Sequence, residues 1–310
     1  MKTIAFIVPY ICKGKQLPNY FQLWLETCRY NPTIDFLIFT DDKTVYDYPK
    51  NTKIHYVTFE FLKELFQKNF DFEINLEKPY KFCDFKPAYG EIFSEYLKGY
   101  DFWGHCDIDL FFGNIRNFIT EEILQKYNRI YTRGHCCLYK NEAEVNGWYR
   151  NLPRCEFQFY KDVFMQETGC CFDEWAGHCG GGLSQIISAN NIEQYDEPDM
   201  ADLDISKNYF KVNRWERLSK DLIFEFDSGQ LFACSNGVKK ETIYVHFQKR
   251  PLIMLSKNKK HFFFVAPGYV VDNIGEIKKV FCILNKMKFL FNYYWKKSKT
   301  KMNLGRRPIC

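Results

Sequence analysis

Long apolar runs, internal repeats and Pro/Ser-rich linkers are all missing from this sequence of 310 residues. Because no stretch of roughly 18 or more apolar residues occurs, the sequence argues against a membrane-spanning helix. The run Met1–Pro9 is short, ends at a proline and lacks a small-residue cleavage site, so we interpret it as a first strand and not as a signal peptide. We therefore expect a soluble, cytoplasmic protein with one main domain.

The 13 cysteines include no C-x-x-C pair. Their odd number, the length of the chain and the lack of an export signal argue against a disulfide scaffold, so we expect reduced and mostly buried thiols. A zinc site formed by Cys170, Cys171, His178 and Cys179 is the alternative. Adjacent cysteines, however, do not easily turn both sulfurs toward one tetrahedral metal.

The charge is distributed unevenly along the chain. The net charge is +5, but residues 278–310 contain ten basic residues and no acidic one, so residues 1–277 carry a net charge of −5. A mildly acidic main body argues against nucleic-acid binding as its function. The C-terminal segment mixes lysines with aromatic residues, which is typical of an amphipathic helix at a membrane surface. A helix that packs its aromatics on the domain is the alternative.

Apolar runs alternate with helix-length connections in the first half of the chain. Ile4–Tyr10 and Ile34–Thr40 are nearly continuous apolar runs, as expected for strands buried on both faces of a parallel sheet. The pattern predicts a further strand at Lys53–Phe59, a helix that starts at Pro18 and a helix over Pro87–Leu97. This alternation predicts an α/β fold with a mixed, mostly parallel central sheet in residues 1–277.

The strongest functional signal is Asp107-Ile108-Asp109, which follows the predicted buried strand Tyr100–Cys106. Side chains two residues apart in an extended segment project to the same face, so both carboxylates can serve one ligand. Carboxylates suit Mg²⁺ or Mn²⁺, and open α/β sheets bind ligands beyond the carboxyl ends of their strands. The alternative is a strand end in a solvated turn, where Asp is common.

The segment Lys78–Gly113, with Asp84-Phe85-Lys86-Pro87 ahead of the D-x-D, resembles nucleotide-sugar glycosyltransferases of the GT-A fold. More narrowly, it resembles a family encoded in bacterial capsule and O-antigen clusters. The stretches 6–10, 18–21 and 36–42 fit the same family, and the resemblance covers about residues 1–255. It implies a single GT-A-like, Rossmann-like domain over residues 1–277, followed by the basic aromatic helical tail 278–310.

The resemblance also implies roles for particular positions. Asp109 would be the principal ligand of Mn²⁺ or Mg²⁺, and Asp107 would face the metal or the ribose. Asp84 would accept from the uracil N–H and Lys86 would reach a phosphate, although a solvated pair before a helix is the alternative. The positions expected to border the base and ribose are Pro9, Tyr10, Thr40 and Asp41.

A late strand, Thr242–Phe247, carries the next candidate ligand. Transferases of this kind bring a late histidine to the metal, which implies His246, and follow it with basic residues on the diphosphate, which implies Lys249 and Arg250. Imidazole is a good ligand for Mn²⁺, and Lys or Arg suits phosphate oxygens. The alternative for His246 is a satisfied structural residue, and we expect His105 to be packed inside its strand.

The candidate base lies in Cys171-Phe172-Asp173-Glu174-Trp175. An inverting transferase needs a carboxylate to remove the proton of the acceptor hydroxyl, and Asp173 or Glu174 fits that need. The aromatic face of Trp175 could stack on a sugar ring, and the glycines at 180–182 let the backbone approach a ligand closely. Solvated acids in a flexible loop are the alternative.

These features predict a metal-dependent glycosyltransferase. The resemblance implies a UDP-sugar as donor and a lipid-linked or growing bacterial surface polysaccharide as acceptor. We expect the enzyme to move a hexose, galactose-type in pyranose or furanose form, at the inner face of the cytoplasmic membrane. One alternative is a non-catalytic glycan- or nucleotide-binding protein on the same scaffold. The other is a sugar nucleotidyltransferase, but the Gly-rich loop expected after the first strand is reduced to Ile11–Lys15, which has one glycine.

Overall fold

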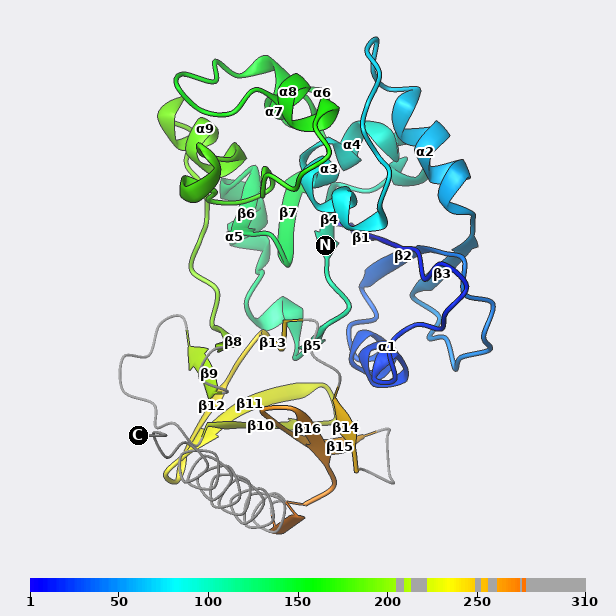
Figure 1. Cartoon of the computed structure of the whole chain (residues 1–310). Helices are drawn as coiled ribbons and strands as arrows, with labels where there is room; N and C mark the ends of the chain where they lie inside the picture. Colours follow the sequence, from blue (N-terminus) through cyan, green and yellow to red (C-terminus); the bar gives the residue numbers. More distant parts are fainter. Residues whose placement is uncertain (205–208, 213–221, 249–251, 256–260, 274, 277–310) are drawn as a thin grey trace, which may run out of the picture.

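A computed structural model describes residues 1–204, 209–212, 222–248, 252–255, 261–273 and 275–276. Lys249, Arg250 and the basic segment 278–310 lie outside the described residues. The described residues form three sheets: a helix-covered sheet in the upper half of Figure 1, a small sheet at the centre and a mostly antiparallel sheet below. Within the described ranges, no helix is long and apolar enough to cross a membrane.

The upper sheet confirms the predicted α/β class. Strands β3, β2, β1 and β4 run parallel, and β7 is antiparallel to its neighbours β4 and β6. The sheet is therefore mixed and mostly parallel. Its strands, in spatial order, are β3 (Thr52–Tyr56), β2 (Ile34–Thr40), β1 (Ile4–Tyr10), β4 (Phe102–Cys106), β7 (Cys136–Lys140) and β6 (Arg129–Arg133).

Strand β1 shows why its apolar run is continuous. Ile4, Phe6 and Val8 belong to the core below the sheet, whereas Ala5 and Ile7 belong to the core above it. Successive side chains of a strand point to opposite faces, so a strand between two cores has no polar face. Helix α1 (Phe21–Arg29) packs in the lower core. The helices whose buried residues lie in the upper core are α2 (Phe59–Gln67), α3 (Phe82–Phe85), α4 (Tyr89–Ile92), α6 (Ala143–Asn146), α7 (Trp148–Asn151), α8 (Tyr160–Met165) and α9 (Leu183–Ala189).

Five predicted elements differ in extent from those observed. The helix expected to start at Pro18 begins at Phe21, the strand expected over Tyr100–Cys106 begins at Phe102, and the late strand expected over Thr242–Phe247 covers Tyr244–His246. The other two differ as follows. The strand predicted at Lys53–Phe59 ends at Tyr56, because the side chain of Thr58 accepts a hydrogen bond from the Phe61 amide and caps α2. The helix predicted over Pro87–Leu97 is broken into η2 (Lys86–Ala88), α4 and η3 (Ser94–Leu97). The break follows α4 at Phe93, whose φ and ψ of −104° and 20° are not helical.

Two sheets that the sequence pattern did not predict complete the described fold. The central one has the order β5 (Leu110–Phe112), β13 (Tyr244–His246), β8 (Met200–Asp204) and β9 (Tyr209–Val212). The lower one has the order β12 (Val238–Glu241), β11 (Gln230–Ser235), β10 (Ile223–Asp227), β15 (Phe262–Ala266), β16 (Tyr269–Val271) and β14 (Ile253–Met254). The short helix α5 (Glu121–Lys126) precedes β6, with Thr120 as its cap.

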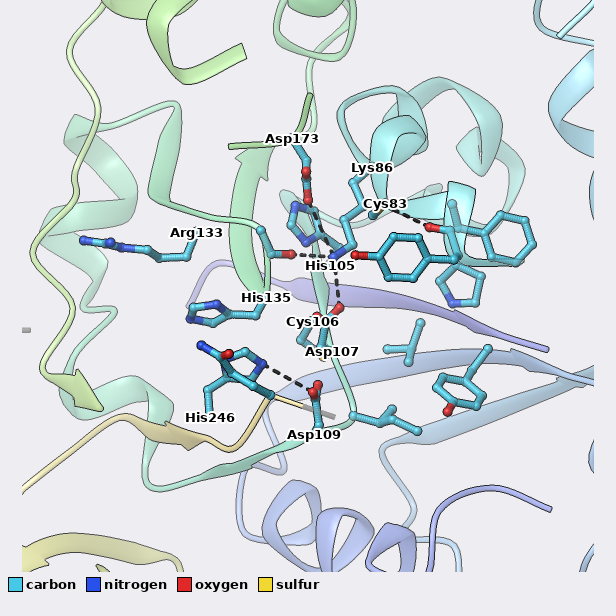
Figure 2. A pocket seen from close by; sticks show the side chains of 18 of the residues that line it. Cys83, Lys86, His105, Cys106, Asp107, Asp109, Arg133, His135, Asp173 and His246 are labelled. Carbon is cyan, nitrogen blue, oxygen red and sulfur yellow. Dashed lines mark hydrogen bonds and ion pairs between the residues drawn. The ribbon is translucent and has the colours of Figure 1, made fainter. Parts of the chain in front are cut away.

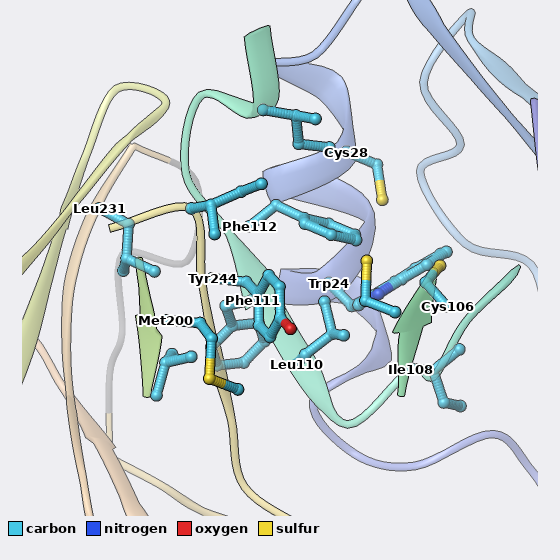
Figure 3. Packing of buried hydrophobic residues seen from close by; sticks show 14 of the residues in the cluster. Trp24, Cys28, Cys106, Ile108, Leu110, Phe111, Phe112, Met200, Leu231 and Tyr244 are labelled. Atoms are coloured by element: carbon cyan, nitrogen blue, oxygen red, sulfur yellow. The ribbon is translucent and has the colours of Figure 1, made fainter. Parts of the chain in front are cut away.

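Strand β5 joins the upper sheet to the lower ones. Figure 3 shows Leu110, Phe111 and Phe112 between helix α1 and the strands that carry Met200 and Tyr244. One continuous apolar cluster extends from β1 through β5 to Val270 of β16. Because β5 follows the D-x-D directly, this packing fixes the position of both carboxylates.

Candidate functional site

A cavity of about 1070 Å³ opens at the carboxyl ends of β1 and β4. This is the edge at which open α/β sheets bind ligands. Pro9 and Tyr10, at the end of β1, line the cavity, which leaves their expected place beside the base and ribose a prediction. The remaining described residues with candidate roles that line it are Lys86, Asp107, Asp109, Asp173, Glu174 and His246.

The structure brings Asp107, Asp109 and His246 together, although 137 positions separate the last two. One donor atom of each lies within 4.8 Å of the others. Asp107 follows β4, Asp109 precedes β5, and His246 of β13 is paired with Leu110 of β5. The Nε2 atom of His246 lies 3.4 Å from Oδ2 of Asp109, as Figure 2 shows. Two carboxylates and an imidazole form a donor set that suits Mn²⁺ or Mg²⁺.

Asp202 orients the histidine from behind. It lies on β8, paired in register with His246, and its Oδ1 is 2.9 Å from His246 Nδ1. Gln248 donates to the other oxygen of Asp202 at 2.7 Å. A carboxylate on the second ring nitrogen is the usual outer partner of a metal-binding histidine, and here it leaves Nε2 facing Asp109.

The carboxylates around His246 control its protonation. Burial by itself lowers the pKa of His246, but the hydrogen bonds with Asp109 and Asp202 outweigh burial and raise it to about 9. The ring of His135 stacks on that of His246 with 4.2 Å between centroids. A metal binds the neutral imidazole, so a cation at this position displaces the proton of His246.

Lys86 connects the D-x-D to the candidate base. It is only 8% exposed, and its Nζ atom lies 2.9 Å from Oδ1 of Asp107 and 3.6 Å from Oδ2 of Asp173. Nζ also donates to the carbonyl of Gly134. Burial would lower the pKa of Lys86, but the two carboxylates outweigh it and hold the pKa well above its usual value. Lys86 is therefore a buried cation shared by two carboxylates, not one half of a solvated pair.

The surroundings of the Asp173 carboxyl bring its pKa toward neutral pH. It is 3% exposed, and burial raises its pKa from 3.8 to about 7, while Lys86 acts in the opposite direction. Its neighbour Glu174 accepts a hydrogen bond from the Gly134 amide at 3.2 Å. Arg129, which is fully buried, donates to the main-chain carbonyl of Asp173 at 3.0 Å and so anchors this part of the loop.

Asp84 corrects one expectation. Its carboxylate is fully buried and does not line the cavity. It accepts from Lys81 Nζ at 2.8 Å and from the amides of Cys170 and Phe172 at 3.0 and 3.2 Å. These contacts hold the loop before Asp173 against α3 and leave no oxygen for a uracil. The role of Asp84 is structural.

Thr40 and Asp41 also differ from expectation. Thr40 is fully buried, and the Asp41 carboxylate accepts from the amides of Cys12 and Lys13 at 2.6 and 2.9 Å. Neither residue lines the cavity. Asp41 shapes the loop that follows β1, where Lys13 has a φ of 53°. Its contribution to the site is therefore indirect, through the chain that leaves Tyr10.

His105 is packed inside β4, as predicted. It is 1% exposed, its ring lies edge-on to that of Tyr89 with centroids 6.4 Å apart, and burial lowers its pKa well below the usual value. The site residues that sequence reasoning missed are Asp202, Arg133 and His135. The Asp107 amide donates to the carbonyl of His135 at 2.9 Å, a contact that depends on the antiparallel pairing of β4 with β7.

The chain belongs to DUF6625, a family of unknown function whose model matches residues 6–273. That range includes the upper sheet except for Ile4 and Ala5, the cavity lining and every described residue of the site. No curated protein matches the chain. The function must therefore be inferred from the chemistry of the site.

Proposed function

From the chemistry of the cavity and the resemblance noted in the sequence, we propose that the chain is a metal-dependent glycosyltransferase. It would transfer a hexose, galactose-type in pyranose or furanose form, from a UDP-sugar to a lipid-linked or growing bacterial surface polysaccharide. One observation carries the proposal: Asp107, Asp109 and His246 converge at the wall of a cavity that also holds the buried carboxyl of Asp173. The three candidate metal ligands and the candidate base Asp173 would therefore face the same cavity, which is large enough for a ligand.

The donors at the cation position fit a hard divalent metal. Asp109 and His246 are buried, Asp107 is partly exposed toward the cavity, and Asp202 fixes the imidazole from behind. Mn²⁺ or Mg²⁺, once bound there, would offset the negative charge that develops on the departing nucleoside diphosphate. Pro9 and Tyr10 would border the nucleoside, because they end the strand beside β4.

Asp173 would remove the proton from the attacking acceptor hydroxyl. With a pKa of about 7 it is a stronger base than an ordinary aspartate and is still partly ionised at neutral pH. Lys86 would stabilise the carboxylate form before the proton is taken. Glu174 accepts a backbone hydrogen bond from Gly134, and we assign it the positioning of this loop. Trp175 is half-exposed and its indole donates to Thr132 at 2.9 Å; it does not line the cavity, so it would meet a sugar ring only beyond the cavity wall.

The acceptor would come from the membrane. The ten basic residues of 278–310, interleaved with aromatics, suit an anionic lipid surface, at about 1 kcal/mol for each basic residue near it. Such a surface would bring the cavity to a lipid-linked acceptor. Cosedimentation with anionic vesicles, compared for the full chain and a chain ending at residue 277, tests this part of the proposal; equal binding contradicts it.

Calorimetric titration with UDP, GDP and dTDP, each with and without Mn²⁺, tests the nucleotide and metal together. We expect Mn²⁺-dependent binding of UDP, at least about tenfold weaker in Asp109→Ala because a principal ligand is lost. Asp71→Ala is the matched control, since the Asp71 side chain is 86% exposed and lies outside the cavity. Mn²⁺-independent binding, or none, contradicts the proposal.

Turnover then separates an enzyme from a binding protein. Release of UDP from UDP-galactose is measured with an acceptor extract, for the unmodified chain and for Asp173→Asn. We expect Asp173→Asn to keep UDP binding and to lose turnover by about 10²–10⁴-fold, the usual contribution of a general base. Binding without turnover in the unmodified chain would favour the non-catalytic glycan- or nucleotide-binding alternative.

A further inference from the structure

The loop between α8 and α9 holds a second group of metal-binding side chains. Sγ of Cys171, a ring nitrogen of His178 and Sγ of Cys179 all lie within 4.8 Å of one another. His178 is exposed, and the two cysteines are partly buried. These donors are distinct from Asp107, Asp109 and His246, although Cys171 lines the same cavity.

The conformation of the loop explains how adjacent cysteines can take part in one metal site, because only one of them needs to face it. Cys170 turns inward, where it is buried and its thiol donates to the carbonyl of Thr168 at 3.4 Å. Cys171 has a φ of 52°, which reverses the chain locally and turns its thiol toward His178. A positive φ is uncommon for a residue other than glycine. Only one of the two adjacent sulfurs is therefore offered to the cluster.

The distances fit a tetrahedral ion. With Zn–S bonds of about 2.3 Å and Zn–N bonds of about 2.0 Å, neighbouring donors of a tetrahedral site lie roughly 3.5–3.8 Å apart. Sγ of Cys171 lies 3.9 Å from Nε2 of His178. The remaining separations are at most 4.8 Å, so shifts of about 1 Å or less would complete the geometry.

We propose that Cys171, His178 and Cys179 bind a zinc ion, with solvent in the fourth position. Thiolate and imidazole are soft and borderline donors that favour Zn²⁺, whereas the carboxylate-rich group nearby favours Mg²⁺ or Mn²⁺, so the two positions select different metals. The cysteine thiols lose their protons on binding. Because Asp173 and Glu174 lie between the first ligand and the second, the ion braces the loop that carries them.

Cobalt provides a spectroscopic test on the full chain, purified with reductant and freed of metal with a chelator. Co²⁺ bound to thiolates gives sulfur-to-metal charge-transfer absorption, which a carboxylate and imidazole site cannot give. We expect one equivalent to produce this band, and Zn²⁺ to abolish it by displacement. The band should be lost in Cys179→Ser and in His178→Asn; His178 is exposed, so its replacement does not threaten folding.

Two controls keep this result separate from the proposed function. Cys155→Ser should retain the band, because Cys155 is exposed and outside the cluster. Asp109→Ala should also retain it while losing Mn²⁺-dependent UDP binding. The proposal is overturned if no band forms, if the band survives in both Cys179→Ser and His178→Asn, or if mass spectrometry of the unreduced protein finds Cys171 and Cys179 joined as a disulfide. Zn²⁺ that leaves amide exchange over 171–182 unchanged would refute the bracing role.

Discussion

Replacing Asp173 by Asn should remove a specific pH dependence of stability. The folded protein raises the pKa of Asp173 from 3.8 to about 7, so between these values the folded state holds a proton that the unfolded state has released. Stability falls with rising pH wherever the folded state binds more protons. Asp173 therefore costs the unmodified protein stability as the pH rises from about 4 to 7. An amide at this position does not titrate, so Asp173→Asn should lack that loss.

The size of the effect follows from the pKa. A rise from 3.8 to about 7 corresponds to about 4 kcal/mol when it is fully expressed. Between about pH 5 and pH 8, the linkage relation predicts that Asp173 lowers the free energy of unfolding by about 2.5 kcal/mol. Other groups titrate in the same range: stability gained from His246 is full below pH 6.5 and is lost as the pH rises through about 9, whereas the lowered pKa values of His105 and His135 have the opposite effect.

The contributions of these other groups cancel when the free energy of unfolding of Asp173→Asn is subtracted from that of the unmodified chain. Urea unfolding is measured at about pH 5, 6, 7 and 8 for the unmodified chain, Asp173→Asn and the control Glu174→Gln, with the free energy extrapolated to water. Relative to Asp173→Asn, the unmodified chain should lose about 2.5 kcal/mol over the range. Glu174→Gln should keep most of that slope, because Asp173 is still present. Parallel curves for the unmodified chain and Asp173→Asn would refute the buried, protonated carboxyl and its role as a base tuned to neutral pH.

Three further results are expected. Asp202→Asn should weaken Mn²⁺ binding about 10–100-fold in a metal titration, because His246 loses the carboxylate that orients it; unchanged affinity would contradict the metal assignment. Lys86→Met should move the pH midpoint of turnover above about 7, because the cation that lowers the Asp173 pKa is removed; a midpoint that stays in place would show that Asp173 is not the titrating group. Gly104→Ala should destabilise the protein by about 1–3 kcal/mol in urea unfolding, because the added Cβ would clash with the backbone of β7, and a neutral effect would contradict the close strand packing.

The upper sheet could be predicted because its signals are local. Strands β1 and β2 are continuous apolar runs, and their observed bounds, Ile4–Tyr10 and Ile34–Thr40, are those predicted. The lower sheet was not predicted, although it carries a signal of its own. Two-residue turns at 228–229 and 236–237 join β10, β11 and β12, and Asn236-Gly237 is a typical hairpin turn with both φ angles positive. The strands are short and partly exposed, so the turns were the better signal.

The residues of the candidate site also differ in how far they could be predicted from local sequence. Asp107 and Asp109 could be located because they follow one strong strand. Asp202 could not, because its place depends on the parallel pairing of β8 with β13, 44 positions later in the chain. The expectation for Asp84 was wrong because a motif gives the residue type and spacing but not the face of a one-turn helix; α3 turns this carboxylate toward the 170–172 loop.

The charges of the cavity give an independent argument for a metal. At neutral pH and without a metal, its described lining has three cationic side chains, Lys86, Arg133 and His246, against the four carboxylates of Asp107, Asp109, Glu174 and Asp202 and the partly ionised Asp173. Two like charges about 4 Å apart repel by on the order of 4 kcal/mol at an effective dielectric constant of about 20. A diphosphate placed beside Asp107 and Asp109 would meet that repulsion at each, and Lys86 is already shared between two carboxylates. A divalent cation between the Asp107 and Asp109 carboxylates would replace this repulsion by attraction, so under the proposed function we expect the metal to accompany or precede the nucleotide. Tight UDP binding in the presence of a chelator would place the diphosphate elsewhere and remove the reason for assigning catalysis to this cavity.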